Sequence, residues 1–158
     1  MHKLLTNLRG ESGQSTVELA VVLPLLVVVI LALVDFGRAL DMFQQAEQAA
    51  SGGARLAAVD FTPASGTLAD YIKQNLVLGE LQTGSGKDAG AQGPVQVCIS
   101  FPTGGPNGTG QLGDPVKVTV TNTYEFIPGG IVPGSATISG NATMRLEQTP
   151  NFSAGCST

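Results

Sequence analysis

Residues 13–40 read GQSTVELAVVLPLLVVVILALVDFGRAL, and the centre of this stretch is uniformly apolar. Sixteen consecutive residues, Leu19 to Val34, carry no charge, and thirteen of them are leucine, isoleucine or valine. An ordinary soluble helix keeps one polar face, so it does not carry such residues all round. Placed at residues 14–34, the span makes a helix of about 32 Å, against roughly 30 Å of hydrocarbon in a bilayer. The sequence therefore predicts one transmembrane helix.

The residues that flank the span indicate its orientation. Lys3 and Arg9 precede it and Arg38 alone follows closely, which favours a cytoplasmic N-terminus and an extracytoplasmic C-terminal domain. A cleavable secretory signal has a shorter apolar region followed by a small-x-small site, whereas this run leads into LVDFGRAL. A plain membrane anchor stays open as an alternative.

Composition argues against several classes of function. The net charge is −4 and the eight Lys and Arg residues form no stripe, so we expect no nucleic-acid partner. The single histidine is His2, which leaves the body of the chain without an imidazole for proton transfer or zinc binding. We expect no enzyme activity, no cofactor and no metal site. A pocket that gathers several carboxylates would instead favour an enzyme or a small-molecule binder. The carboxylates that could form such a pocket are Asp70, Glu80, Asp88 and Asp114.

The stretch 13–40 resembles the TadE-like family of type IV pilin-related proteins, which belong to bacterial tight-adherence (Tad, Flp-type) pilus systems. The matching positions are Gly13, Gln14, Glu18, Pro24, Asp35, Phe36, Gly37 and Arg38. The resemblance implies that a prepilin peptidase removes a leader of residues 1–13, so that the mature chain begins at Gln14. It further implies a minor pilin or pseudopilin of the bacterial inner membrane. Such a protein assembles with other pilin subunits and the Tad machinery, and it can enter an extracellular pilus.

The spacing of Glu18 has a physical interpretation of its own. Cleavage would expose an α-amino group at Gln14, where a helix N-terminus in lipid also has unpaired N–H groups and a partial positive charge. A carboxylate one turn away can offset both, within one chain or between neighbouring subunits, and would then set axial register. The alternative is that Glu18 only reaches the lipid headgroups. Pro24 removes one backbone donor and is a candidate helix bend.

The helix is expected to continue beyond the membrane as a stalk over residues 35–61. An apolar stripe at heptad spacing, broken by Glu47, predicts either the core face of the domain or a seam between subunits, or each on a different stretch. Glycines at 52 and 53 predict a bend or break. The stripe consists of Phe36, Leu40, Phe43, Glu47, Ala50, Ala54, Ala57 and Phe61.

Residues 62–158 are expected to form an extracytoplasmic α+β domain. Thr67 is the candidate N-cap of a second helix, with Asp70 three residues on. Alternation with period two predicts strands near residues 94–102, 115–126 and 136–148, giving an antiparallel sheet of three or four strands. The helix stripe is the natural cover for the apolar face of this sheet.

Cys98 is expected on the outer face of its strand, and Cys156 lies in the C-terminal tail. Because the predicted topology places both thiols outside the cytoplasm, we expect a disulfide that holds the tail over the polar side of the sheet, with two free thiols as the alternative. The functional hypothesis is a TadE-like minor pilin or pseudopilin. The alternative is an uncleaved, single-pass, membrane-anchored adhesion or binding protein.

Overall fold

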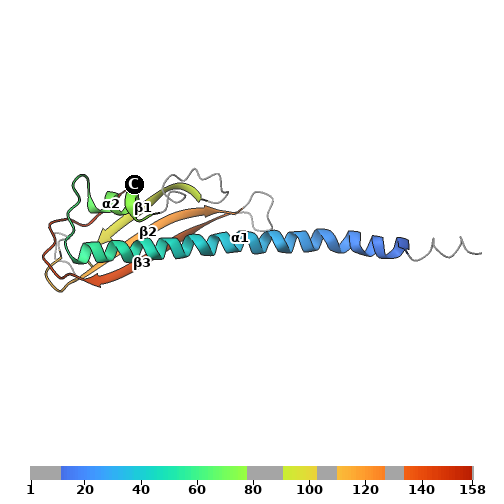
Figure 1. Ribbon diagram of the computed structural model, residues 1–158, viewed down its shortest axis with the longest axis horizontal. Coiled ribbons are helices and arrows are strands. Elements are labelled where there is room, and N and C mark those ends of the chain that lie inside the picture. Colours follow the sequence, from blue (N-terminus) through green and yellow to red (C-terminus); the bar gives the residue numbers. More distant parts are fainter. Residues whose placement is uncertain (1–11, 78–90, 103–109, 127–133, 158) are drawn as a thin grey trace, which may run out of the picture.

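A long helix and a small antiparallel sheet dominate the molecule (Figure 1). The computed structural model describes residues 12–77, 91–102, 110–126 and 134–157. The C-terminal part of the long helix lies along the sheet, and its N-terminal part extends beyond it. This is the predicted α+β architecture. In chain order the elements are α1 (Ser12–Ala58), α2 (Leu68–Asn75), β1 (Ala91–Ser100), β2 (Pro115–Glu125), β3 (Ser135–Arg145) and β4 (Gly155–Ser157).

Helix α1 is 47 residues long, which corresponds to about 70 Å. It runs through Pro24 without interruption and ends three residues before the predicted limit at Phe61. Asp60 adopts a left-handed backbone conformation, with φ of 54°. A residue in this conformation commonly stops a helix, because its backbone can no longer continue the helical path.

The glycine pair in α1 corrects a prediction, because the helix continues through Gly52 and Gly53 instead of breaking there. Both glycines face α2. A Cβ atom at Gly52 would lie 3.2 Å from Cδ1 of Leu76, and one at Gly53 would lie 2.9 Å from Cδ1 of Ile72. The missing side chains therefore give α2 room to approach, and this packing offsets the low helix propensity of glycine.

Among the described residues, the sheet has four strands in the order β3-β2-β1-β4, with antiparallel pairing throughout. The three predicted strands are confirmed, with ends that shift by at most three residues. The tail differs from its prediction. It does not lie over the polar side of the sheet but adds β4 to the edge beside β1, where Cys156 stands opposite Cys98. Backbone pairing thus extends the sheet by one short strand.

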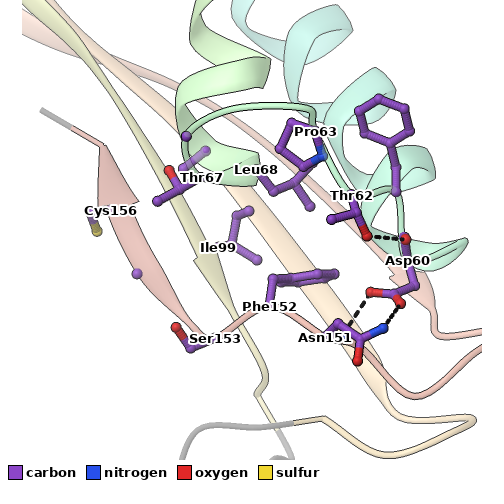
Figure 2. Close-up of a pocket in the computed structure, with 14 residues that line it drawn as sticks. Asp60, Thr62, Pro63, Thr67, Leu68, Ile99, Asn151, Phe152, Ser153 and Cys156 are labelled. Carbon is purple, nitrogen blue, oxygen red and sulfur yellow. Dashed lines mark hydrogen bonds between the residues drawn. The ribbon is translucent and has the colours of Figure 1, made fainter.

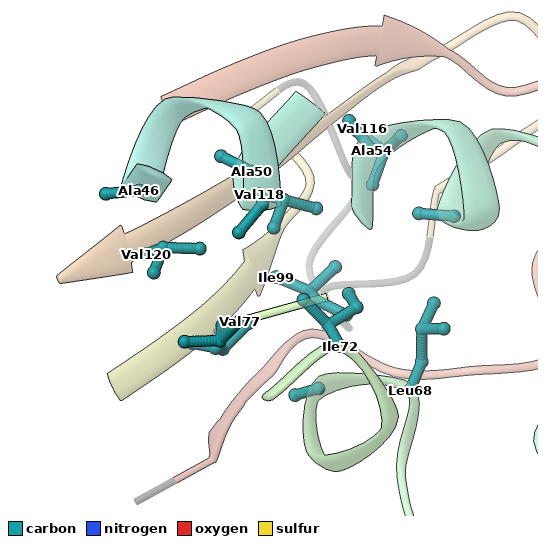
Figure 3. Close-up of a cluster of buried hydrophobic side chains, with 14 of the residues drawn as sticks. Ala46, Ala50, Ala54, Leu68, Ile72, Val77, Ile99, Val116, Val118 and Val120 are labelled. Carbon is teal, nitrogen blue, oxygen red and sulfur yellow. The ribbon is translucent and has the colours of Figure 1, made fainter. Parts of the chain in front are cut away.

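The core lies between one face of the sheet and the two helices, as Figure 3 shows. Small side chains of α1 meet valines of β2, so that helix and strand approach closely. The contact is tightest at Gly140 of β3, where an added Cβ atom would lie 2.3 Å from backbone atoms of Ala46 and Glu47. The central members of the core are Ala46, Ala50, Ala54, Ile72, Val97, Ile99, Val116, Val118 and Val120.

The N-terminus of α2 is a capping box, as the sequence predicted. Asp70 N–H donates to the Thr67 hydroxyl oxygen at 3.2 Å, and Thr67 N–H donates to the Asp70 carboxylate at 3.2 Å. The Thr67 hydroxyl also donates to this carboxylate, at 2.6 Å. These hydrogen bonds from Thr67 hold the pKa of Asp70 below its ordinary value. They fix where α2 starts and so orient its apolar face toward α1.

The predicted stripe on α1 divides into a buried part and an exposed part. Its C-terminal members Ala50, Ala54 and Ala57 are buried in the core. Phe36, Leu40 and Phe43 are instead 61%, 45% and 41% exposed. In this part of α1 the covered face lies one residue earlier and uses smaller or polar side chains, namely Asp35, Ala39, Met42, Ala46 and Ala49. Close helix–sheet contact selects for small residues here, so hydrophobicity alone misassigns the face.

Candidate functional site at the membrane junction

Helix α1 contains a segment, within Ser15–Ala58, that is long and apolar enough to cross a membrane. None of its most apolar stretch is covered by the rest of the described chain. The side chains between Val17 and Val34 are exposed. Large apolar side chains exposed over such a length require a nonaqueous or protein environment.

The residues of the expected processing motif lie in the first two turns of α1. Gly13 and Glu18 are exposed, and an added Cβ atom at Gly13 would meet nothing within 4 Å. Four residues separate Gln14 from Glu18, so the backbone places them on the same side of the helix, one turn apart. This geometry suits the proposed pairing of a carboxylate with a new N-terminus. Residues 1–11 of the expected leader lie outside the described residues.

A buried polar contact joins α1 to the sheet directly beyond the predicted span. The Tyr124 hydroxyl donates to Oδ1 of Asp35, and it lies 3.2 Å from the backbone carbonyl oxygen of Asp35. Asp35 is 8% exposed and Tyr124 is 1% exposed. Groups so deeply buried need hydrogen-bond partners, and each of these supplies the other's. The contact fixes the end of β2 against the helix one residue after Val34.

The surroundings of Tyr124 perturb its hydroxyl. Burial, followed by the hydrogen bond and negative charge of Asp35, raises the pKa of Tyr124 to about 12. The positive charge of Arg38 acts in the opposite direction. The tyrosine therefore stays protonated, and remains a hydrogen-bond donor, throughout the physiological range.

Two further residues of β2 and its end complete this junction. The ring of Phe126 packs edge-on against Tyr124, with centroids 5.4 Å apart. Asn122 is 3% exposed, and its Oδ1 accepts a hydrogen bond from Thr123 N–H at 2.7 Å. Among the described residues its Nδ2 has no hydrogen-bond partner. The inward face of β2 therefore changes from valine to polar and aromatic residues as it nears the membrane span.

The four residues of the Asp35–Arg38 motif differ in burial. Asp35 points to the sheet and is buried, whereas Phe36, Gly37 and Arg38 are exposed. Sequence reasoning identified Asp35 only as a position of the resemblance and missed its partner Tyr124. A signal was present, because a carboxylate next to an apolar run and a tyrosine on the inward face of a strand both need buried partners.

The predicted disulfide joins Cys98 of β1 to Cys156 of β4, whose Cα atoms are 4.0 Å apart. Cys98 lies on the outer face of the sheet, between the buried residues Val97 and Ile99, as expected. The bridge closes a separation of 58 residues and attaches β4 to the sheet edge.

A pocket of about 320 Å³ lies where α1 ends, far from the membrane segment. Figure 2 shows its apolar wall, which includes Leu68, Ile99 and Phe152. Its carboxylate is already engaged. Asp60 accepts hydrogen bonds from the backbone N–H of Asn151 at 2.8 Å and from Nδ2 of Asn151 at 2.5 Å. These bonds tie the C-terminal segment to the end of α1, so they have a structural role.

The carboxylates considered for an enzyme are engaged elsewhere or are not described. Asp70 caps α2, and the Asp114 carboxylate accepts from Gln111 N–H at 2.9 Å. Glu80 and Asp88 lie outside the described residues. Within the described part of the chain, no group of three or more His, Cys, Asp or Glu residues is arranged to hold a metal ion.

Comparison with known proteins identifies the N-terminal segment. Residues 13–55 match the family model of TadE-like proteins, which covers most of α1 and stops before α2. Comparisons with curated proteins and with solved structures gave no match. The match, together with the one long apolar helix found in the described part of the chain, fits a membrane protein associated with a Tad pilus. Residues 13–55 are therefore similar to TadE-like proteins, as the resemblance in the sequence indicated.

Proposed function

We propose that this protein is a minor pilin or pseudopilin that takes part in the assembly of a Tad-type pilus. One observation carries the proposal: the family match begins at Gly13, the expected processing residue, and follows α1 almost to its end. The matched segment is thus the helix with the expected cleavage site, which in a pilin-like subunit is the part that is stored in the membrane and later packed.

The mechanism we propose is assembly, without catalysis. A prepilin peptidase cuts after Gly13 and releases an α-amino group at Gln14. Glu18, one turn away, pairs with this amino group or with that of a neighbouring subunit, and this pairing sets the axial register of packed helices. Pro24 lacks a backbone donor and loosens the helix locally. The bare N-terminal half of α1 provides the packing surface.

The proposed topology places the sheet domain outside the cytoplasm. Lys3 and Arg9 before the span favour a cytoplasmic N-terminus. The Cys98–Cys156 disulfide supports the same orientation, because such bonds persist in oxidising compartments. We therefore place the protein in the bacterial inner membrane as a single-pass subunit, ready for transfer into the pilus.

The test is the N-terminus of the protein extracted from membranes. Co-expression with a prepilin peptidase should give a chain that begins at Gln14, whereas cells without the peptidase should retain Met1. Gly13→Leu is a matched variant, because a Cβ atom added at this position would have no neighbour within 4 Å in the described part of the chain. It should insert normally and remain uncut. An intact Met1 in bacteria that assemble the pilus would contradict the proposal and favour an uncleaved, anchored adhesion or binding protein.

A further inference from the structure

An apolar stripe on α1 continues past the predicted end of the membrane span. Phe36, Leu40 and Phe43 are separated by four and three residues, so they lie on one side of the helix. All three are between 41% and 61% exposed. The same side within the span consists of Val22, Leu25, Val29 and Leu33, which are also exposed. The stripe is therefore continuous with the membrane-facing surface.

The rest of the described protein leaves this stripe bare. Successive residues of a helix are 100° apart, so Phe36 lies about a quarter turn from Asp35, which faces the sheet. The stripe is also turned away from α2, which α1 meets through Gly52 and Gly53. A second apolar group stands near the same level, because Phe126 packs on Tyr124 and Tyr124 bonds to Asp35.

We propose that Phe36, Leu40, Phe43 and Phe126 form a collar that docks onto the outer lipid surface of the membrane. The collar acts while the subunit is stored in the bilayer, and α1 tilts toward the stripe. The proposal requires only that α1 spans the membrane. It goes beyond the proposed pilus function and does not depend on it.

The lengths require such a tilt. Phe43 lies nine residues beyond Val34, about 13 Å along the helix, whereas the headgroup layer on each side is only about 5–7 Å thick. An upright helix would leave Phe43 in water. Membrane helices tilt by up to about 40°. A tilt near that limit, toward the stripe, brings Phe43 closer to the membrane by about 5 Å or more. The side chains also lean toward the helix N-terminus, which here is toward the membrane.

The chemistry of the stripe favours lipid over a second copy of the chain. Seams between membrane helices are rich in small residues that let backbones approach, whereas the stripe contributes two phenylalanines and a leucine. The small residues of this part of α1, Ala39 and Ala46, are already used against the sheet. Glu47 lies in line with the stripe and is exposed, so it marks the end of the lipid contact.

The test uses single-tryptophan variants, because the chain has no tryptophan of its own. Full-length Phe43→Trp is reconstituted in phosphatidylcholine vesicles, with and without lipids brominated near the headgroup. We expect blue-shifted emission and a loss of intensity with the brominated lipids. Gln44→Trp is the matched control at the same height and about 100° around the helix, and it should be quenched less. Leu112→Trp, on the loop before β2, should not be quenched.

Two outcomes would overturn the proposal. In the first, Phe43→Trp is quenched no more than Leu112→Trp. In the second, its emission shifts only as the protein-to-lipid ratio rises and brominated lipid does not quench it, which would mean that another copy covers the stripe. Leu40→Trp provides a second position if Phe43→Trp fails to form the native disulfide. Because none of these readouts involves processing or assembly, they fail independently of the pilus proposal.

Discussion

At the scale of single residues, the contact between Asp35 and Tyr124 joins the end of the predicted membrane span to the sheet domain. Val34 ends the predicted span, and the next side chain is already buried against the sheet. A buried carboxylate without a partner is costly, so the tyrosine hydroxyl allows a charged or polar residue to sit at this boundary. The contact also joins the end of β2 to α1.

Tyr124→Phe should destabilise the protein by about 1–3 kcal/mol, because it keeps the ring but leaves the Asp35 carboxylate without this donor. The loss is measured as the change in free energy of unfolding in urea, with the protein in detergent. Tyr71→Phe is the control, since Tyr71 is the other tyrosine and lies on α2, away from Asp35. Equal stability of the two variants would mean that the contact contributes nothing.

The raised pKa of the Tyr124 hydroxyl predicts that the stability of the protein depends on pH. Folding raises the pKa of Tyr124 from 10.0 to about 12, so the folded state holds this proton more tightly than the unfolded state. The resulting stability is fully present below pH 10 and is lost as pH rises from 10 through 12. In Tyr71→Phe, the absorbance of tyrosinate reports on Tyr124 alone. A titration midpoint near 10 in the folded protein would contradict the burial of this hydroxyl.

At the scale of elements, the packing of α1 on β3 depends on one missing side chain. Gly140→Ala would place a Cβ atom 2.3 Å from the backbone of Ala46 and Glu47, and backbone atoms cannot rotate away. We expect a loss of about 1–3 kcal/mol or more, seen as a lower urea midpoint. Gly155→Ala on β4 is the matched control, because its Cβ atom would meet nothing within 4 Å. Equal urea midpoints for the two variants would show that α1 can move away from β3 without a loss of stability.

The edge strand β4 gives a second prediction at this scale. It contains three residues, and its pairing with β1 is reinforced by the disulfide. Reduction should lower the free energy of unfolding by up to about 4 kcal/mol, the chain-entropy value for a loop of 58 residues. A double variant, Cys98→Ser with Cys156→Ser, should not respond to the reductant. Labelling of both thiols without reductant would rule out the bridge.

The elements also show what sequence can predict here. The inward residues of β2 and the cap at Thr67 follow from alternation and local hydrogen bonding, which act over a few residues. The buried face of α1 does not follow from such local patterns. From Leu19 to Val34 the helix is apolar all round, so periodicity has no contrast, and beyond it the largest apolar side chains are on the exposed side. Ala39, Ala46 and Gly140 mark the true contact by their small size, a signal that appears only once both partners are known.

At the scale of the whole molecule, α1 has two halves with different surfaces. Its C-terminal half is held by the sheet and α2, and its N-terminal half is bare. The Asp35–Tyr124 contact joins the two halves, so under the proposed function a register set in the membrane would reach the domain through this contact. The proposed function assigns the packing of subunits to the bare half of α1.

Glu18 provides the test of that arrangement. Glu18→Ala should leave processing and membrane insertion intact, because the residue lies outside the folded domain, but it should weaken incorporation into the pilus. Glu18→Gln separates charge from shape, since it keeps the size of the side chain and cannot form an ion pair with an amine. We expect both variants to be defective, as measured by the ratio of pilus-associated to membrane-retained subunit. If Glu18→Gln assembles like the wild type, then charge does not set the register, and a hydrogen bond from the headgroup region suffices to explain this position.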